Sequence, residues 1–436
     1  MREPFVRARH ARTGKPMSGR DSGEGESRRI GGPARTGPLA GIRIVDLTSV
    51  VSGPLATMML ADQGADVIKI ENPNGGDFTR QVSNRSGGVT ANFLNNNRSK
   101  RSVTVDLKDP RGLEVVKRLV AGADAFAQNF RPGVVERMGL GYEALAAVNP
   151  RLVYLSISGF GDTGPYRDKP VYDPLVQAIS GLTTVQGGSD DARPRLVRTI
   201  VPDKVSGMMA AQALTAGLLA QARTGRGQHV KISMLEAVID FLWHSDMGSQ
   251  TFVGADIPQQ AAQSFIDLIY DTLDGFITVS VMTDRQWVGL SRAVERPDLL
   301  TDPRFLTASL RQENIDARLA VTQESLEGFT TEEALDRLEM QDVPCAPVLT
   351  RWQMTRHPQV EAMGIVAELD HPAAGKVRQA RPAARFSDGP LDIATGAPAL
   401  GAHTDAVLAE AGFADEEIAA LREAGVVGGP REEQTA

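Results

Sequence analysis

The first half of the chain alternates short β-branched runs with stretches that have helical spacing. Apolar runs at 42–47 and 65–71 flank segment 54–63, which begins with Pro54 and is followed by Gly64. Proline suits the first turn of a helix, and glycine suits the position after its last turn. A strand, a helix and a strand within about 30 residues predict a βαβ unit with parallel strands.

The same alternation continues along the chain and predicts a mostly parallel sheet in an α/β domain. We therefore expect a Rossmann-like large domain. Further strands are expected at 102–107, 123–129, 152–158 and 229–233, and further helices after Asp109 and Pro110, after 131–133, and over 204–222 and 235–243.

A polar, irregular segment separates this half from a second unit. The second unit combines a β-rich run at 275–281 with amphipathic helices, which predicts a smaller α+β domain. The first residues are rich in Arg, Gly and Ser, and we expect a disordered leader or a misassigned start. The expected limits are 1–37 for the leader, 38–247 for the first part of the large domain, 248–262 for a linker, 263–340 for the small domain and 341–436 for a return segment that completes the large domain.

Composition narrows the functional classes. The chain has 47 Lys and Arg against 54 Asp and Glu, a formal net charge of −7, which disfavours general nucleic-acid binding. Cys345 is the single cysteine, so an intrachain disulfide and a cysteine-cluster metal site are excluded, and a reducing cytoplasmic location is expected. The six histidines show no metal-binding spacing, and no apolar window reaches the ~18 residues of a membrane span.

The first βα turn is the natural ligand site of such a sheet. Residues 50–54 carry neither a dinucleotide-binding nor a P-loop glycine pattern. Glu71 is either a ribose-binding acid at a strand end or a surface carboxylate. The cations within 97–101 either bind a phosphate or form a solvated face. Segment 129–133 leads into a helix start that suits an anion, and Arg137 follows one turn later.

Asp203 follows Pro202 at the head of an Ala- and Met-rich helix. It is either the N-cap of that helix or a carboxylate nucleophile at a strand-to-helix junction. A serine hydrolase is disfavoured because no Gly-x-Ser-x-Gly pattern is present.

Seven segments, taken in order, identify a family resemblance. They are 37–47, 65–77, 129–133, 137–142, 156–161, 225–228 and 401–405. Together they resemble the class III CoA-transferases, the family that includes formyl-CoA transferase and carnitine CoA-transferase. The resemblance covers nearly everything from Pro38 to Val427 and implies a dimer of two interlocked rings.

The resemblance implies that Asp203 is the nucleophile and that Tyr172 and Asp173 assist it. The acyl group would pass through an aspartyl anhydride and an aspartyl-CoA thioester, with coenzyme A as cosubstrate, a free carboxylic acid as acceptor, and no permanently bound cofactor or metal. The implied CoA contacts are Val51, Ser52, Asn72, Asn97, Arg98, Ser99, Lys100, Asn129, Phe130, Arg137, Lys169 and Val171.

Three positions depart from the family pattern. Asn72 replaces an arginine that helps to hold the nucleotide, and Val51 replaces a glutamine of formyl-CoA transferase. The Val51 difference, together with the lack near 254–269 of the glycine run that formyl-CoA transferase has, favours a larger acyl group or a dicarboxylate over formate and oxalate. Tyr172 stands before Asp173 where the related α-methylacyl-CoA racemases have histidine, and tyrosine is a poor near-neutral base. Transfer is thus favoured over two alternatives, a racemase or epimerase and a non-catalytic acyl-CoA binder.

Overall fold

The computed structural model describes residues 36–254, 268–388 and 392–428. Most of the expected leader and much of the expected linker lie outside these ranges. A seven-stranded sheet in the order β14-β5-β2-β1-β6-β7-β8 forms the centre of the large domain. Its strands are β1 (Arg43–Leu47), β2 (Asp66–Glu71), β5 (Lys100–Val105), β6 (Ala125–Gln128), β7 (Val153–Ser158), β8 (Gln228–Ser233) and β14 (Val427–Gly428).

The first six of these strands in chain order are parallel, and only β14 is antiparallel, to β5. The chain builds outward from β1 to β2 and β5, then returns to the other side of β1 for β6, β7 and β8. The expected α/β fold with a Rossmann-like parallel sheet is confirmed. The strand order reverses between β1 and β6, and parallel α/β sheets bind ligands at the carboxyl ends of the strands at such a point.

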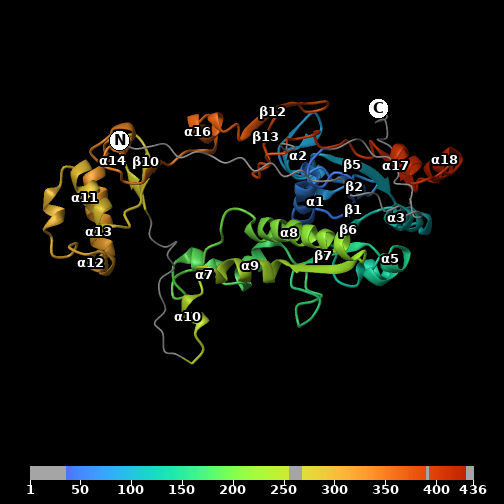
Figure 1. Ribbon diagram of the computed structural model, residues 1–436, viewed down its shortest axis with the longest axis horizontal. Helices are drawn as coiled ribbons and strands as arrows, with labels where there is room; N and C mark the ends of the chain where they lie inside the picture. The colour runs from blue at the N-terminus through green and yellow to red at the C-terminus, as the bar shows by residue number, and fades with distance from the viewer. Residues whose placement is uncertain (1–35, 255–267, 389–391, 429–436) are drawn as a thin grey trace, which may run out of the picture.

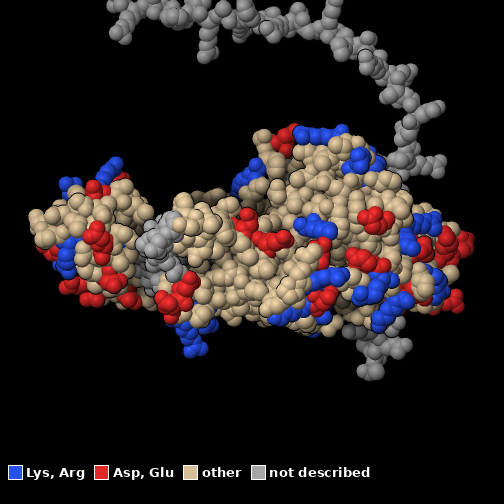
Figure 2. All heavy atoms as spheres, turned by 90° about the horizontal axis from the view of Figure 1, so that it is seen from below, with Lys and Arg blue, Asp and Glu red and all other residues tan. Residues whose placement is uncertain are grey.

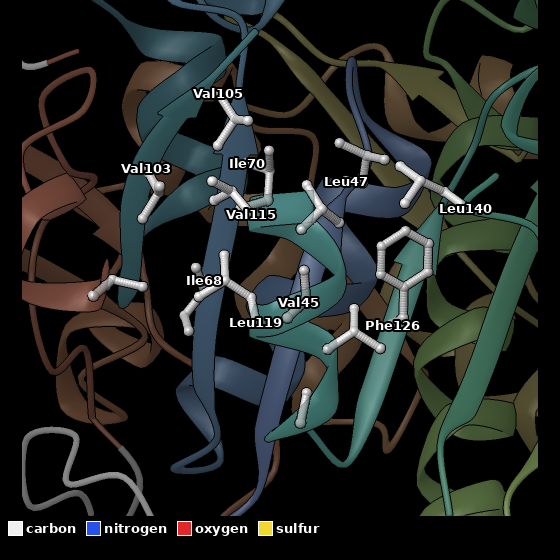
Figure 3. Close-up of a cluster of buried hydrophobic side chains, with 14 of the residues drawn as sticks. Val45, Leu47, Ile68, Ile70, Val103, Val105, Val115, Leu119, Phe126 and Leu140 are labelled. Carbon is white, nitrogen blue, oxygen red and sulfur yellow. The ribbon is translucent and has the colours of Figure 1, made fainter. Parts of the chain in front are cut away.

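Helices cover both faces of the sheet (Figure 1). Small apolar side chains of α1 (Ser52–Asp62) and α8 (Val201–Thr224) pack on one face. Larger side chains fill the other face. There, Val115 and Leu119 of the helix at 110–121 lie over Val45 and Phe126 of the sheet (Figure 3). This face is covered by α3 (Pro110–Ala121), α5 (Tyr142–Val148), α17 (Thr404–Glu410) and α18 (Asp415–Glu423).

The second unit lies at one end of the molecule (Figure 1). Its sheet consists of β9 (Ile269–Asp271), β10 (Phe276–Val279) and β11 (Cys345–Pro347). Because β11 pairs with β10, the expected domain limit at 340 is too early, and Val343 also belongs to this core. The helices are α11 (Asp284–Ala293), η3 (Pro297–Leu300), α12 (Ala308–Glu313), α13 (Ile315–Leu326) and α14 (Thr331–Glu339).

The remaining elements connect these units. The chain returns to the large domain through a hairpin, and β14 then adds to the edge of the large sheet beside β5. Among the described residues, no helix is both long and apolar enough to span a bilayer. The connecting elements are η1 (Phe78–Arg80), β3 (Arg85–Ser86), β4 (Val89–Thr90), α2 (Ala91–Asn97), α4 (Val134–Arg137), α6 (Asp173–Ile179), α7 (Leu182–Gly187), α9 (Met234–Trp243), α10 (Gly248–Thr251), α15 (Arg351–Met354), α16 (Pro358–Ala362), β12 (Val366–His371) and β13 (Gly375–Ala380).

Candidate active site

The turn between β1 and α1 is tight and strained. Val50 has a φ of 70°, a left-handed conformation that a β-branched residue rarely adopts. A Cβ on Gly53 would lie 2.3 Å from the Thr48 Cβ, so glycine is needed there. No side chain caps the start of α1 at Ser52. The backbone N–H groups of this helix start are therefore available to a negatively charged group.

Asp203 lies inside the first turn of α8. The helix begins at Val201 with Ile200 as its N-cap, and no side chain makes a capping hydrogen bond. This corrects the N-cap interpretation of Asp203. Pro202 precedes Asp203 within the same turn, where its missing N–H costs no helical hydrogen bond. The Asp203 carboxylate is thus not used to cap its own helix.

A close approach of α8 to α1 brings this carboxylate to the first βα turn. Gly207 lies one helical turn after Asp203, and a Cβ on Gly207 would come within 2.7 Å of the Ser52 carbonyl oxygen. The absence of a side chain allows the two helices to approach each other. The Ser52 backbone N–H lies near the Asp203 carboxylate and acts to lower its pKa.

A second carboxylate lies beside the first. Asp173 begins α6 and is buried, and its Oδ2 accepts a long hydrogen bond of 3.5 Å from the Asp203 backbone N–H. Its Oδ1 accepts a hydrogen bond of 2.6 Å from Gln177 Nε2. Gln177 Oε1 also accepts from the Val197 N–H at 2.9 Å, so one side chain ties Asp173 to the segment that leads into α8.

Burial raises the pKa of Asp203 to about 6, and the negative charge of Asp173 adds to this shift. The Ser52 N–H opposes it by stabilising the carboxylate form. Burial also raises the pKa of Asp173, against the hydrogen bond from Gln177. No cation contributes to the pKa of Asp203 among the described residues. At pH 7 most Asp203 side chains are therefore ionised but poorly solvated, which suits a nucleophile.

The cationic cluster before β5 lies inside the protein, contrary to the expectation that it contacts CoA phosphates. The Arg98 guanidinium is 2.8 Å from Asp62 Oδ2, and Lys100 Nζ is 3.0 Å from Asp46 Oδ2. Asn97 and Ser99 are also buried. All six residues of β5 are buried, so its side chains point into the protein on both faces and require internal partners.

Glu71 is neither a free ribose-binding acid nor a surface carboxylate. Its side chain is buried and accepts hydrogen bonds from Arg80 Nε at 2.7 Å and from Ser102 Oγ at 2.6 Å. Burial opposes ionisation of Glu71, yet Arg80 and Lys69 hold its pKa below the ordinary value. The side chain therefore belongs to the internal charge network of the large domain.

The other expected contacts fall into two groups. Val51 is buried as the residue before α1, and Phe130 and Val171 are half-buried in apolar clusters. The polar side chains on the surface are Asn72, Tyr172, Arg137 and Lys169, with Lys169 Nζ 3.9 Å from the centre of the Tyr166 ring. The structure thus brings Ser52, Asp173 and Asp203 together.

Asn129 is occupied by the first βα turn. Its Oδ1 accepts a hydrogen bond of 2.9 Å from the Ser49 N–H, and its Nδ2 donates one of 2.8 Å to the Ser49 carbonyl oxygen. Sequence reasoning assigned Asn129 to CoA and missed Gln177 and Gly207. The four-residue spacing of Gly207 from Asp203 places both on one helix face and could have indicated the close approach.

The charged surface shows no continuous positive tract on the face seen in Figure 2, where basic and acidic side chains are intermingled. In the described ranges, no group of three or more His, Cys, Asp or Glu residues could hold a metal ion. The site at the helix starts is therefore defined by two carboxylates, a backbone N–H and an amide.

Residues 39–404 match the CoA-transferase family III. The chain is 34% identical to succinyl-CoA:glutarate CoA-transferase of Homo sapiens, over 89% of this chain and 90% of the relative. It is 33% identical to formyl-CoA:oxalate CoA-transferase of Escherichia coli O157:H7, over 88% and 98%.

Solved structures agree with this match. A CAIB/BAIF family protein from Brucella suis superposes with a TM-score of 0.76 and 32% sequence identity, covering 86% of this chain and 99% of that chain. The match to the family extends over most of the described large and small units. On these grounds, the chain belongs to CoA-transferase family III.

Proposed function

We propose that this protein is an enzyme that transfers CoA from an acyl-CoA to a free carboxylic acid, with the Asp203 carboxylate as nucleophile. The observation that carries the proposal is the placement of Asp203. This carboxylate is partly buried near the strand-order reversal of the sheet, no cation among the described residues contributes to its pKa, and the Ser52 N–H favours its charged form. Membership of the family supports CoA thioester chemistry.

The reaction proceeds by exchange of activated acyl groups. A carboxylate oxygen of Asp203 attacks the thioester carbonyl carbon, the C–S bond breaks, and CoA leaves as a thiolate. The product on the enzyme is a mixed anhydride. The thiolate then attacks the Asp203 carbonyl carbon, the anhydride C–O bond breaks, and the donor acid leaves. The acceptor carboxylate reverses these two steps and departs as the new acyl-CoA.

The residues at the helix starts assist each stage. Negative charge develops on an Asp203 carboxyl oxygen when the thiolate adds to its carbonyl carbon, and the Ser52 N–H is placed to stabilise that charge. The 24-residue helix α8 adds the positive end of its dipole near this carboxylate. Gln177 ties Asp173 to the segment before α8, and the negative charge of Asp173 adds to the burial that raises the pKa of Asp203.

The surface cations are the better candidates for the CoA phosphates, because the buried ones already have partners. Arg137 follows the predicted anion site at the start of α4, and Lys169 lies on the surface in the segment before Asp173. We infer that these two side chains meet the phosphates and that Val171 lies along the pantetheine arm.

A dicarboxylic acid is the substrate class that we propose. The relative of Homo sapiens is named for succinyl-CoA and glutarate, and that of Agrobacterium fabrum, 34% identical over 87% of this chain, for succinate and glutarate. Val51 occupies the position of a glutamine in formyl-CoA transferase and removes a polar group from the turn. This change fits an acid longer than oxalate.

We also propose the interlocked homodimer. Large apolar side chains remain exposed on the outer faces of α8 and α9, including Met208, Leu219, Phe241 and Trp243. Exposed apolar surface of this kind marks a protein interface. A measurement of mass in solution should give twice the mass of the chain.

The test of the nucleophile is a covalent adduct. The wild-type protein incubated with succinyl-CoA should yield a peptide containing Asp203 with CoA attached by a thioester, detected by mass spectrometry. Borohydride should reduce that side chain to an alcohol. Asp203→Asn should form no adduct, and its transfer rate should be lower than that of the wild type by more than about 10³-fold. Asp240→Asn, an exposed carboxylate on α9, is the matched control and should retain both.

Two outcomes would select the alternatives. Exchange of the α-hydrogen for deuterium without any acceptor acid would indicate a racemase or epimerase. Binding of acyl-CoA with no turnover across a panel of mono- and dicarboxylic acids would indicate a non-catalytic binder.

A further inference from the structure

Side chains from several strands bind the main chain of the first βα turn. Asp46 Oδ1 accepts a hydrogen bond of 2.9 Å from the Thr48 N–H. Lys69 Nζ donates one of 2.8 Å to the Thr48 carbonyl oxygen. Asn129 binds both the N–H and the carbonyl oxygen of Ser49. Three consecutive residues of the turn are fixed in this way, because Asp77 Oδ1 accepts from the Val50 N–H at 3.2 Å.

The Lys69–Asp77 ion pair is the innermost part of this arrangement. The two side chains are 0% and 1% exposed, and Lys69 Nζ is 3.0 Å from Asp77 Oδ2. Burial opposes the charged form of Lys69, but Asp77, Asp46 and Glu71 keep its pKa above the ordinary value. Both partners are therefore ionised at neutral pH, and each also holds one main-chain group of the turn.

The turn needs such support because its conformation is unfavourable. The left-handed conformation of Val50 is unfavourable for a β-branched residue and persists only where the surroundings enforce it. The strained Val50 is separated from Ser52 by a single residue, Val51, which precedes α1. A relaxed turn would rotate the first N–H groups of α1.

We propose that Lys69, Asp77 and Asn129 are positioning residues that hold the strained turn so that the Ser52 N–H faces the Asp203 carboxylate. They act through the main chain of the turn, to which their hydrogen bonds are made. This inference rests on the proposed function of Asp203. It assigns the buried ion pair to catalysis, because stability alone does not require charges there: buried pairs are often replaceable by apolar residues at no loss.

The test compares two substitutions of Asp77 with a control in the full-length enzyme. Asp77→Ala removes the acceptor of the Val50 N–H hydrogen bond and leaves Lys69 without its ion-pair partner. Asp77→Asn keeps the same side-chain shape and retains an acceptor oxygen. Asp66→Asn is the control, because Asp66 is a buried acid at the start of β2, the strand that carries Lys69, and pairs with Arg101 at 2.6 Å. The readouts are kcat, KM for acyl-CoA, the pH profile of kcat, and hydrogen exchange of a peptide covering 48–58.

Asp77→Ala should lower kcat by about 10²-fold, the effect of losing one preorganised donor, while KM changes less than about threefold. Loss of the Ser52 donor should also move the acid limb of the profile to higher pH and speed exchange in the peptide. Asp77→Asn should recover at least tenfold of the lost kcat. Asp66→Asn should lower stability without moving the acid limb.

Equal effects of Asp77→Ala and Asp66→Asn on kcat, or an unmoved acid limb in Asp77→Ala, would overturn the inference. If Asp77→Ala fails to fold, Asp77→Asn with Asn129→Asp supplies the same comparison through the pH profile and the exchange of 48–58. An active Asp203→Asn protein would instead refute the proposed function itself, so the two failures are distinguishable.

Discussion

Two carboxylates near the carboxyl end of the parallel strands have opposite surroundings. Asp46 is completely buried, yet Lys100, Lys69 and two threonine side chains overcome the cost of burial and lower its pKa to about 2. Asp203 is less buried, no cation among the described residues contributes to its pKa, and burial raises that pKa to about 6. The same residue type is thus a stable anion in one place and a weakly stabilised one in the other.

The difference shows how the protein separates structure from chemistry. Charges that support the fold are compensated inside it, as in the pairs Lys100–Asp46 and Arg98–Asp62. Among the described residues, no cation contributes to the pKa of the carboxylate proposed to react, and that pKa reflects burial, the like charge of Asp173 and the Ser52 N–H. Strongly shifted pKa values of this second kind mark functional sites.

Removal of Lys100, the cation beside Asp46, should make the surroundings of Asp46 more like those of Asp203. Of the substitutions proposed for this protein, this one should have the largest effect on stability. Lys100→Met leaves a fully buried charge without its main partner and should lower the free energy of unfolding by about 3–5 kcal/mol, measured by urea denaturation. Asp46→Asn combined with Lys100→Met should recover part of this loss. If the free energy of unfolding of Lys100→Met falls by less than about 1 kcal/mol, the Asp46 carboxylate does not depend on its cation.

The converse substitution, Asp203→Asn, should stabilise the protein while abolishing transfer. The folded pKa of about 6 lies above the unfolded value of 3.8, so the folded state holds the proton more tightly. The wild-type protein therefore loses stability as the pH rises through 6. The gain from Asn should be absent below pH 4 and reach at most about 3 kcal/mol at pH 7.

Thermal unfolding of both proteins between pH 4 and 8 measures this difference. Asp240→Asn, with an exposed side chain, should show no such pH dependence. Equal stability of wild type and Asp203→Asn at pH 7 would show that Asp203 is compensated like Asp46.

The pH dependence of transfer should report the same carboxylate. Below a pH of about 6, kcat should fall about tenfold per pH unit because protonation removes the nucleophile. Asp173→Asn removes a neighbouring negative charge and should move this limb to lower pH. A limb unaffected by Asp173→Asn would argue against coupling of the two acids.

Substitution of the exposed cations should have the smallest effect. In contrast to substitution of the buried Lys100, it should leave stability unchanged. Arg137→Gln or Lys169→Gln should raise KM for acyl-CoA by up to about tenfold, the value of one charge-assisted hydrogen bond, with unchanged unfolding. Arg111→Gln, on the exposed start of α3, is the control and should change neither quantity. A normal KM in both variants would remove these side chains from the CoA site.

Local patterns accounted for much of the fold. Strand and helix periods, Pro54 and Gly64 marked the first βαβ unit, which the structure confirms as β1, α1 and β2. The pattern missed that α8 begins at Val201 and that β5 begins at Lys100, because charged residues obscured the ends of both elements. The strand β9 of the small sheet was also missed, since three residues carry too little periodicity.

By itself, the amino-acid sequence determined the alternation of strands and helices, the parallel sheet that follows from it, and the family that its ordered motifs indicate. Only the tertiary structure decided which charges are used internally. Arg98 meets Asp62 and Lys100 meets Asp46 across the fold, and Gly207 allows Asp203 to reach the start of α1. Residue spacing is a local property, whereas the pairing and solvation of a charge depend on segments that only folding brings together.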